Sequence, residues 1–349
     1  MVQQPRRRPT SADVAARAGV SRTTVSFVIN RRAGSQIPAE TWQRVETAAR
    51  ELGYHPHGAA RQLAAGRSLT LGLVLRQSAD QVVADALLAE TLFGLAAAAR
   101  AGGYRVLLEP LAPGDGTYAE LLRSQRTDGL IVSGPRADDD ELVDLVRDGF
   151  PIVLQGSRLG LDAPSVDVDN RAGAHGAVAF LLGLGHRRIG CITNAPLAYT
   201  AATERLAGYR DALDEAGIAF DAQLVVEGSF VAASGHAAMV TLLARTRPTA
   251  VFVASDVVAI GAMRALREAG LRIPRDVSVV GFDDIALAEH FDPPLTTVRI
   301  PAHSLGETAG QLLVERIAGR PVAARTLLPT QLVIRDSTGA VAPRRAGGP

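Results

Sequence analysis

The chain has 349 residues, of which 47% are hydrophobic, enough for more than one buried core. The net charge of +1 conceals an asymmetry, because residues 1–67 hold eleven Arg and four acidic residues, a balance of +7, and the remainder therefore carries −6. A basic segment joined to a mildly acidic body is typical of a nucleic-acid-binding protein with a separate sensory or catalytic part. The single Cys191 excludes an internal disulfide framework. No apolar run reaches the length of a membrane span and no signal-peptide core is evident, so we expect a cytoplasmic protein.

Residues 10–30 predict two short helices joined by a tight turn. Thr10 and Asp13 fit a capping box at the start of the first helix. Gly19 can end that helix in the left-handed conformation, and Ser21 can cap the second helix. A helix-turn-helix of this kind places its second helix in the DNA major groove. An ordinary helical hairpin in a core would give the same pattern, so this stretch alone leaves both interpretations open.

Three further segments complete the N-terminal part. Residues 1–9 are basic and are expected to form a disordered arm. A third helix is expected over about 38–52, with Trp42 in its core-facing stripe rather than stacked on a base, which completes a headpiece of residues 10–56. Residues 57–66 (HGAARQLAAG) are expected to form a short hinge helix.

From residue 69 buried strands alternate with helices, for example the strand 69–75 and a helix around 84–101. This alternation predicts parallel sheets with right-handed crossovers, and it restarts near residue 169. The sequence therefore predicts an α/β core, 69–338, of two similar parallel-sheet lobes with about five strands each. The expected boundaries are about 69–168 with 299–328 for lobe 1 and about 169–298 with 329–338 for lobe 2, followed by a disordered tail, 339–349.

Several motifs occur in a specific order along the chain. DVAARAGVSRTTVSFVIN is followed by RVETAARELGYHPHGAARQLAAGRS, and then by ERLAGY, ASD, VSVVGFDD and PPLTT. In this combination the chain resembles the lactose-repressor family of bacterial transcription regulators over nearly its whole length. The resemblance implies a helix-turn-helix headpiece, a hinge helix and a core like that of periplasmic sugar-binding proteins. It also implies a homodimeric repressor whose affinity for operator DNA changes when a small-molecule effector, a sugar or sugar derivative, binds between the lobes.

The resemblance assigns DNA contacts residue by residue. Arg22, Thr23 and Phe27 occupy the base-facing positions of the second helix, where Arg22 can make a bidentate contact to guanine. Phe27 departs from the family, in which Arg is common at that position, and packing on the headpiece is the alternative for its ring. Ala60 and Leu63 match the family's minor-groove positions in the hinge. The remaining expected contacts are to phosphates or within helix caps, by Thr10, Ser21, Thr24, Ser26 and Asn30.

The resemblance also assigns effector contacts at the carboxyl ends of the strands. Arg205 and Asp283 are the principal candidates. For Arg205, a helix cap or a surface ion pair is the alternative role. Phe230 matches an aromatic residue that stacks on the ligand. The other expected contacts are Arg76, Gln155, Asp169 and Ser255. Arg76 in the cleft suggests an acidic or phosphorylated ligand. DALLAE (85–90) stands where many members have an aromatic pair, which makes a ring sandwiched between two aromatics less favourable.

Two other classes of protein, an enzyme and a stand-alone solute-binding protein, fit the sequence less well. An enzyme is disfavoured because no glycine-rich phosphate loop follows the strand 69–75, and no histidine has metal-ligand spacing. Asp283 and Asp284 form a carboxylate pair without a candidate nucleophile. A stand-alone solute-binding protein would need a signal peptide and would lack residues 10–65. We therefore expect no cofactor or metal, operator DNA and a small molecule as partners, and a dimer without a C-terminal leucine heptad.

Overall fold

The computed structural model describes residues 9–29, 37–54, 67–112, 117–158 and 160–341. The chain divides into two compact units, Met1–Ser68 and Leu69–Pro349. The predicted hinge helix, with Ala60 and Leu63, lies outside the described residues, as do Asn30 and residues 1–8 of the predicted arm. Within the described ranges, no helix combines the length and apolar character needed to cross a bilayer.

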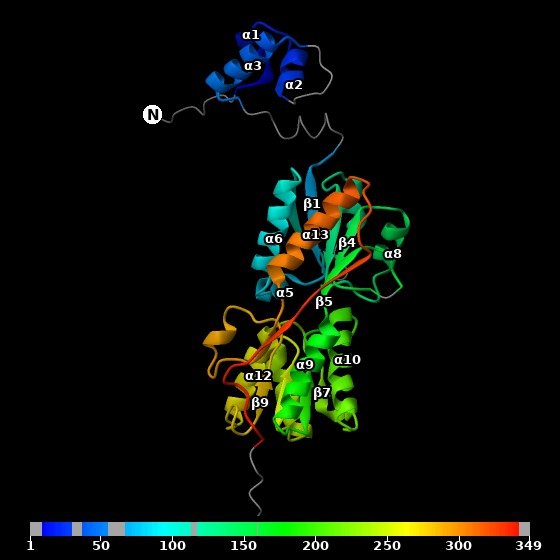
Figure 1. The fold of residues 1–349 in the computed structure, drawn as a ribbon, viewed down its shortest axis with the longest axis vertical. Helices are drawn as coiled ribbons and strands as arrows, with labels where there is room; N and C mark the ends of the chain where they lie inside the picture. Colours follow the sequence, from blue (N-terminus) through cyan, green and yellow to red (C-terminus); the bar gives the residue numbers. More distant parts are fainter. Residues whose placement is uncertain (1–8, 30–36, 55–66, 113–116, 159, 342–349) are drawn as a thin grey trace, which may run out of the picture. The chain divides into compact units, whose positions relative to one another are not determined.

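The described residues of the first unit form three helices, α1 (Ser11–Ala18), α2 (Arg22–Ile29) and α3 (Ala39–Leu52) (Figure 1). The predicted capping box is present: the Thr10 hydroxyl accepts from the Asp13 backbone N–H, and the Asp13 carboxylate accepts from the Thr10 backbone N–H. The three helices enclose one small apolar core. Its buried members are Val14, Ala15, Ala18, Val25, Val28, Val45, Ala48 and Ala49, and Trp42 packs at its edge as expected.

The first lobe of the second unit is built on a six-stranded parallel sheet in the order β11-β5-β4-β3-β1-β2. Leu71 and Leu73 of β1 pack on one face against α6 and α13, and Val74 packs on the other face with α7 and α8. A strand buried on both faces explains the continuous apolar run. The elements are β1 (Thr70–Leu75), α5 (Ala79–Ala84), α6 (Leu88–Ala101), β2 (Arg105–Pro110), α7 (Tyr118–Arg123), β3 (Gly129–Ser133), α8 (Asp140–Arg147), β4 (Ile152–Gln155), β5 (Ser165–Val168), α13 (Ala302–Ile317) and β11 (Arg325–Leu328).

The second lobe has a four-stranded parallel sheet in the order β7-β6-β8-β9. Helices α9 and α10 cover one face and α11 and α12 the other. Helices α11 and α12 cross so closely that a Cβ on Gly261 would lie 1.7 Å from the Ala232 carbonyl oxygen. The elements are α9 (Asn170–Gly183), β6 (Ile189–Ile192), α10 (Thr200–Glu215), η1 (Ala222–Leu224), β7 (Val225–Val226), α11 (Ala232–Arg245), β8 (Ala250–Val253), α12 (Asp256–Glu268), β9 (Ser278–Val280) and η2 (Ala288–His290).

The chain passes between the lobes after β5, before α13 and after β11 (Figure 1). Near these crossings β10 (Thr297–Arg299) and β12 (Gln331–Val333) pair antiparallel as a separate two-stranded ribbon. The expected five strands per lobe are therefore six and four in the parallel sheets. Strand β5, which lacks a long apolar run, was not anticipated.

Two local features differ from the sequence-based prediction. The helix expected around 84–101 begins at Leu88 as α6, and an additional short helix, α5, precedes it. Asp85 separates the two helices, because it is extended and its Oδ1 accepts from the Leu87 N–H at 3.0 Å, an arrangement that competes with helix. The C-terminal segment is bound to the second lobe as far as residue 341. The Gly339 carbonyl oxygen accepts from His186 Nε2 at 3.0 Å, and the Val341 N–H donates to the Leu184 carbonyl.

Candidate functional site

The second helix of the headpiece presents polar side chains to solvent. Arg22 and Thr23 are exposed in its first turn, whereas Val25 and Val28 are buried in the headpiece core. The Ser21 hydroxyl accepts from the Thr24 N–H at 3.1 Å and lies 2.9 Å from the Thr24 hydroxyl, so Ser21 is the predicted cap. The helix is thus fixed at its start and turns Arg22 and Thr23 outward.

Three other predicted DNA contacts, Thr10, Ser26 and Phe27, differ in burial and in hydrogen-bond partners. The Thr10 hydroxyl donates to the Asp13 carboxylate at 2.8 Å, which places Thr10 in the cap of α1. Ser26 is exposed, and Phe27 is only partly buried.

Between the two lobes lies a cavity of about 170 Å³. Both lobes contribute to its wall at the carboxyl ends of parallel strands, the expected location of a ligand in this architecture. Four of the predicted effector contacts line it, together with residues that were not predicted. The lining residues are Gln77, Gln81, Ala84, Asp85, Ala86, Leu87, Asn194, Arg205, Phe230, Ser255, Val257, Asp283, Ile285 and Ile300.

Arg205 of α10 is the buried cation of this wall. Its Nε donates to Asn170 Oδ1 at 2.8 Å and its Nη1 donates to the Ala254 carbonyl oxygen at 2.6 Å. Nη1 also lies 3.3 Å from Asp283 Oδ1, and the guanidinium carbon is 3.8 Å from the centroid of the Phe282 ring. The side chain is 8% exposed. Arg205 therefore belongs to a buried network, and the alternative of a surface ion pair is excluded.

Asp283 reaches the cavity from an unusual loop after β9. Asp283 and Asp284 have φ values of 121° and 56°, in the region that favours glycine. The buried Asp256 carboxylate fixes this loop, because it accepts from the Ile285 N–H at 3.0 Å and from the Thr297 hydroxyl at 2.6 Å. Burial raises the pKa of Asp283 to about 6, although the Arg205 guanidinium opposes the shift. Asp283 is thus a carboxylate held in place, with a modest cost of ionisation.

The first lobe supplies the opposite wall from the segment after β1. Gln77, Gln81 and Asp85 lie on α5 or beside it, and Leu87 follows them. Gln81 Nε2 lies 3.5 Å from the Ser229 hydroxyl of the second lobe, so the segment approaches the other side of the cavity. Burial raises the pKa of Asp85. Leu87, at one of the two positions where the resemblance expects an aromatic residue, therefore lines the cavity with an aliphatic side chain.

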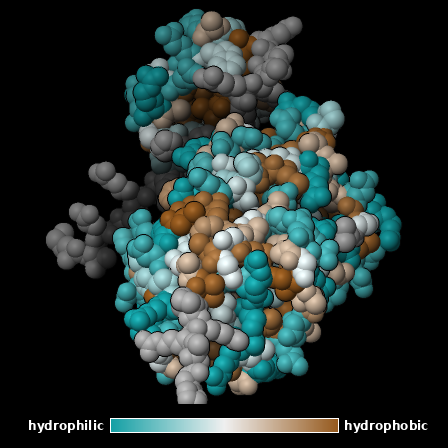
Figure 2. All heavy atoms as spheres, turned by 60° about the horizontal axis from the view of Figure 1, so that its bottom comes forward, coloured by the Kyte–Doolittle hydropathy of each residue, from teal (hydrophilic) through white to brown (hydrophobic). Residues whose placement is uncertain are grey.

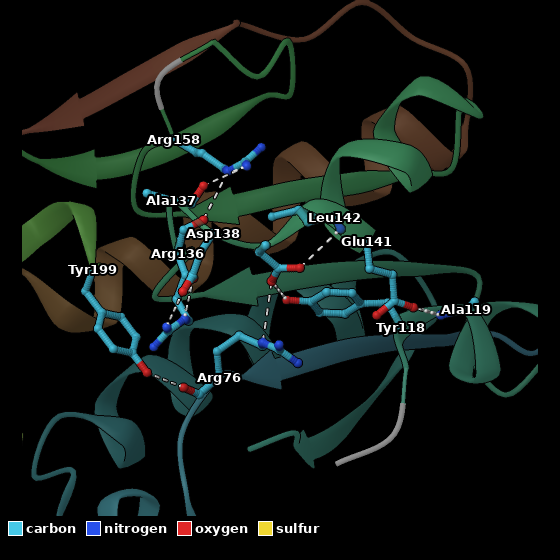
Figure 3. Close-up of polar contacts among 11 residues, drawn as sticks. Arg76, Tyr118, Ala119, Arg136, Ala137, Asp138, Glu141, Leu142, Arg158 and Tyr199 are labelled. Carbon is cyan, nitrogen blue, oxygen red and sulfur yellow. Dashed lines mark hydrogen bonds and ion pairs between the residues drawn. The ribbon is translucent and has the colours of Figure 1, made fainter. Parts of the chain in front are cut away.

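Phe230 links the cavity wall to a contact between the lobes. It has a φ of 62°, and its ring packs edge-on against Tyr199 with centroids 4.9 Å apart. The Tyr199 hydroxyl donates to the Arg76 carbonyl oxygen at 2.6 Å (Figure 3). The Ala137 N–H donates to the Ala198 carbonyl at 2.9 Å. A ligand that touches Phe230 is therefore one side chain away from the lobe-to-lobe contact.

The side chain of Arg76 does not line the cavity. Its guanidinium pairs with Asp139 at 3.4 Å and lies 5.2 Å from the centre of the Tyr118 ring, inside the first lobe (Figure 3). The Tyr118 hydroxyl donates to the same carboxylate at 2.5 Å. The suggestion of an acidic ligand rested on Arg76, and it loses its basis because Asp139 already neutralises that cation.

Two other predicted contacts lie away from the cavity. Asp169 caps α9 by accepting from the Ala172 N–H at 2.8 Å, and it borders a surface groove between α9 and α10 instead. Gln155 ends β4, where its backbone carbonyl accepts from the Gly134 N–H, and its side chain is not part of the cavity wall. Ser255, in contrast, lines the cavity and hydrogen-bonds to the Asp283 carboxylate.

Four polar residues of the wall are not among the predicted contacts: Asp85, and three others for which the sequence holds a signal. Gln77 follows the end of β1, Gln81 lies one turn further on, and Asn194 follows the end of β6. Polar residues directly after buried parallel strands are expected at a ligand cleft. Gln77 and Asn194 follow strand ends just as Arg76 does, so the same pattern indicates them as ligand contacts.

Comparison with known proteins agrees with both units. Residues 10–57 match the model of the lacI family of bacterial regulatory proteins, and residues 178–338 match the periplasmic binding protein-like domain. The transcriptional regulator CelR of Thermobifida fusca is 40% identical over 339 residues, covering 95% of this chain and 99% of that protein. The transcriptional repressor CytR of Escherichia coli K12 is 35% identical over 338 residues, covering 95% and 97%.

Solved structures give the same result. The lac repressor dimer bound to operator and the anti-inducer ONPF superposes with a TM-score of 0.83 at 33% identity, covering 96% of this chain and all (100%) of that chain. The complex of CelR with cellobiose gives a TM-score of 0.72 at 38% identity, covering 95% and 100%.

A helix-turn-helix unit and a two-lobed core with a polar cavity between the lobes define a ligand-responsive DNA-binding regulator. The level of identity and the coverage of both units make the assignment specific. The chain belongs to the lacI family of bacterial regulatory proteins and is a transcriptional regulator.

Proposed function

We propose that the chain represses transcription by binding operator DNA as a homodimer, and that a carbohydrate bound between the lobes changes its affinity for the operator. One observation carries this proposal: the cavity wall joins Arg205 and Asp283 of one lobe to Gln77 and Asp85 of the other. A ligand held by both walls has a different affinity for each arrangement of the lobes. It therefore shifts the population of those arrangements.

In this proposal the base contacts come from α2. The exposure of Arg22 and Thr23 supports their role, and the partly exposed Phe27 is proposed to contact thymine methyl groups. The proposed phosphate contacts are Thr10, Ser21, Thr24, Ser26 and Asn30, and the proposed minor-groove contacts are Ala60 and Leu63.

A carbohydrate suits the cavity because its wall alternates polar and apolar surface. Asp283 and Ser255 can bind hydroxyl groups, and the Phe230 ring can cover the apolar face of a sugar ring. The solved complex of the CelR relative with cellobiose adds support. The proposed effector contacts are Arg205, Phe230, Ser255 and Asp283, with Gln77, Gln81 and Asn194 added.

The proposed dimer accounts for large apolar side chains on the surface. Val83 is 87% exposed and Phe93 of α6 is 72% exposed. The face drawn in Figure 2 mixes hydrophobic and hydrophilic areas. The similar lac repressor structure is a dimer on its operator. The role requires DNA and a ligand but no catalytic step, and it places the protein in the cytoplasm with the chromosome.

DNA reading is tested with an operator selected from random duplexes by the purified protein. Arg22→Ala should weaken binding to that operator by about 5- to 150-fold, the range of one bidentate base contact, and should weaken binding to unrelated DNA much less. Arg50→Ala is the matched control, since it removes an exposed charge from α3. Equal losses on both DNAs for Arg22→Ala would contradict the assignment.

Effector control is tested by titrating the protein–operator complex with cellobiose and a panel of mono- and disaccharides, using fluorescence anisotropy. A binding sugar should change operator affinity by about 5- to 150-fold, the usual range of allosteric coupling. Asp283→Asn should abolish the response and leave the affinity for operator without sugar unchanged. A sugar response that survives Asp283→Asn would contradict the proposed site.

A further inference from the structure

Carboxylates outnumber cations among the charged groups of the cavity wall. Of the described residues that line the cavity, Arg205 is the one basic side chain, and its Nε and Nη1 already donate to Asn170, to the Ala254 carbonyl and toward Asp283. Two carboxylates, Asp85 and Asp283, face this single arginine. The wall is therefore acidic overall.

Two amide oxygens in the same wall have no hydrogen-bond partner within the described structure, Gln77 Oε1 and Asn194 Oδ1. Asn194 is only 9% exposed, so its oxygen is withdrawn from bulk water. Each of these amides also carries an NH₂ donor, but no described group donates to either oxygen, so a ligand O–H or N–H can satisfy them.

Asp85 is the first lobe's contribution to this acidic wall. Its Oδ1 accepts from the Leu87 N–H at 3.0 Å, which fixes the carboxylate at the break between α5 and α6. It faces the cavity from the first lobe, while Asp283 faces it from the second. The negative charge of Asp85 contributes to the raised pKa of Asp283, so the two groups interact across the cavity.

We propose that Asp85 is a specificity-determining residue: it makes the cavity bind uncharged or amine-bearing polyhydroxylated ligands and exclude their phosphorylated or carboxylated derivatives. This inference rests on the proposed function, because it takes the cavity to be the effector site. A ligand rich in O–H or N–H donors bonds to Asp85 and Asp283 at once and so bridges the lobes. An anion brings a third negative charge toward two carboxylates, and like charges brought together cost several kcal/mol.

The test is a charge-matched panel measured by isothermal titration calorimetry. It contains cellobiose, glucose, ribose and galactose, each with an amine-bearing, a carboxylated and a phosphorylated derivative where one exists. We expect each uncharged or amine-bearing member that binds the wild-type protein to bind at least about tenfold more tightly than its anionic derivative. Asp85→Asn, which keeps the acceptor for the Leu87 N–H, should reduce that ratio to less than about threefold.

Asp80→Asn is the matched control, because it removes one exposed charge from α5 and should leave the ratio unchanged. An anionic sugar that binds the wild-type protein as tightly as its parent overturns the inference and leaves the proposed function standing. A ratio unaffected by Asp85→Asn, in a variant whose thermal unfolding matches that of the wild-type protein, also overturns it. A panel without any binder overturns both proposals.

Discussion

The ion pair between Arg205 and Asp283 offers a direct test of how the cavity wall is held together. Arg205→Met keeps most of the side-chain volume and removes a cation that is 8% exposed. Removing one partner of a buried ion pair costs about 3–5 kcal/mol, because the other charge stays buried without compensation. At roughly 2–4 °C per kcal/mol for a domain of this size, the unfolding midpoint of the core should fall by about 10 °C.

The decisive measurement is a double-mutant cycle. In Arg205→Met with Asp283→Asn, the uncompensated carboxylate is gone, so the double variant should regain at least about 1 kcal/mol relative to Arg205→Met alone. Urea unfolding should be followed by far-ultraviolet circular dichroism, since Trp42, the single tryptophan, lies in the headpiece. Arg171→Met is the control, because it breaks an exposed pair in the same lobe and should cost less than about 1 kcal/mol. Additive effects within about 0.5 kcal/mol would refute the pairing.

Three further outcomes are expected. Burial and a neighbouring carboxylate raise the pKa of Asp167 to about 6, so between pH 4 and 6 this side chain binds more protons in the folded protein than in the unfolded protein. Asp167→Asn should therefore stabilise the core, relative to wild type, increasingly as pH rises through that window. A difference in thermal midpoint that is independent of pH would contradict this. Tyr199→Phe should lower the unfolding free energy by about 0.5–1.5 kcal/mol in urea, since it removes the hydrogen bond to the Arg76 carbonyl; no change would show that this bond contributes nothing. Gly261→Ala should lower the free energy of unfolding by about 1–3 kcal/mol, because its Cβ would overlap the backbone of α11. Gly176→Ala, with open space around it, should be neutral or slightly stabilising. Equal effects of the two variants in urea unfolding would refute the close packing.

The sequence predicts local structure well wherever a helix cap or the spacing of apolar residues determines it. The capping box at Thr10, the left-handed Gly19 and the buried run of β1 are all confirmed, because each depends on neighbouring residues in the chain. The break at Asp85 was missed because a single side chain-to-backbone bond outweighs helical periodicity over several residues. The strand β5 was missed because its place in the sheet depends on β4 and β11 rather than on its own composition.

Four of the predicted effector contacts, all in the second lobe, line the cavity, whereas Asp169 of that lobe and both predicted residues of the first lobe do not. Arg205 and Asp283 were predicted and lie together, since each belongs to a rigid loop or helix next to a strand end. Arg76 also ends a strand, but Asp139, distant in the sequence, offers it a buried partner inside the lobe. A strand-end position fixes where the backbone lies, whereas the direction of a long side chain depends on which partner is within reach.

The two walls of the cavity also differ in how firmly they are built. Arg205, Asp283 and Ser255 are held by buried hydrogen bonds, so the second lobe presents a preorganised surface. The first lobe offers the segment around α5, and none of the six residues of this fully described helix is buried. A ligand should therefore dock on the second lobe and draw the α5 segment toward it. That segment directly follows β1, the first strand after the boundary between the two units. We therefore expect ligand binding to influence the headpiece mainly through this segment.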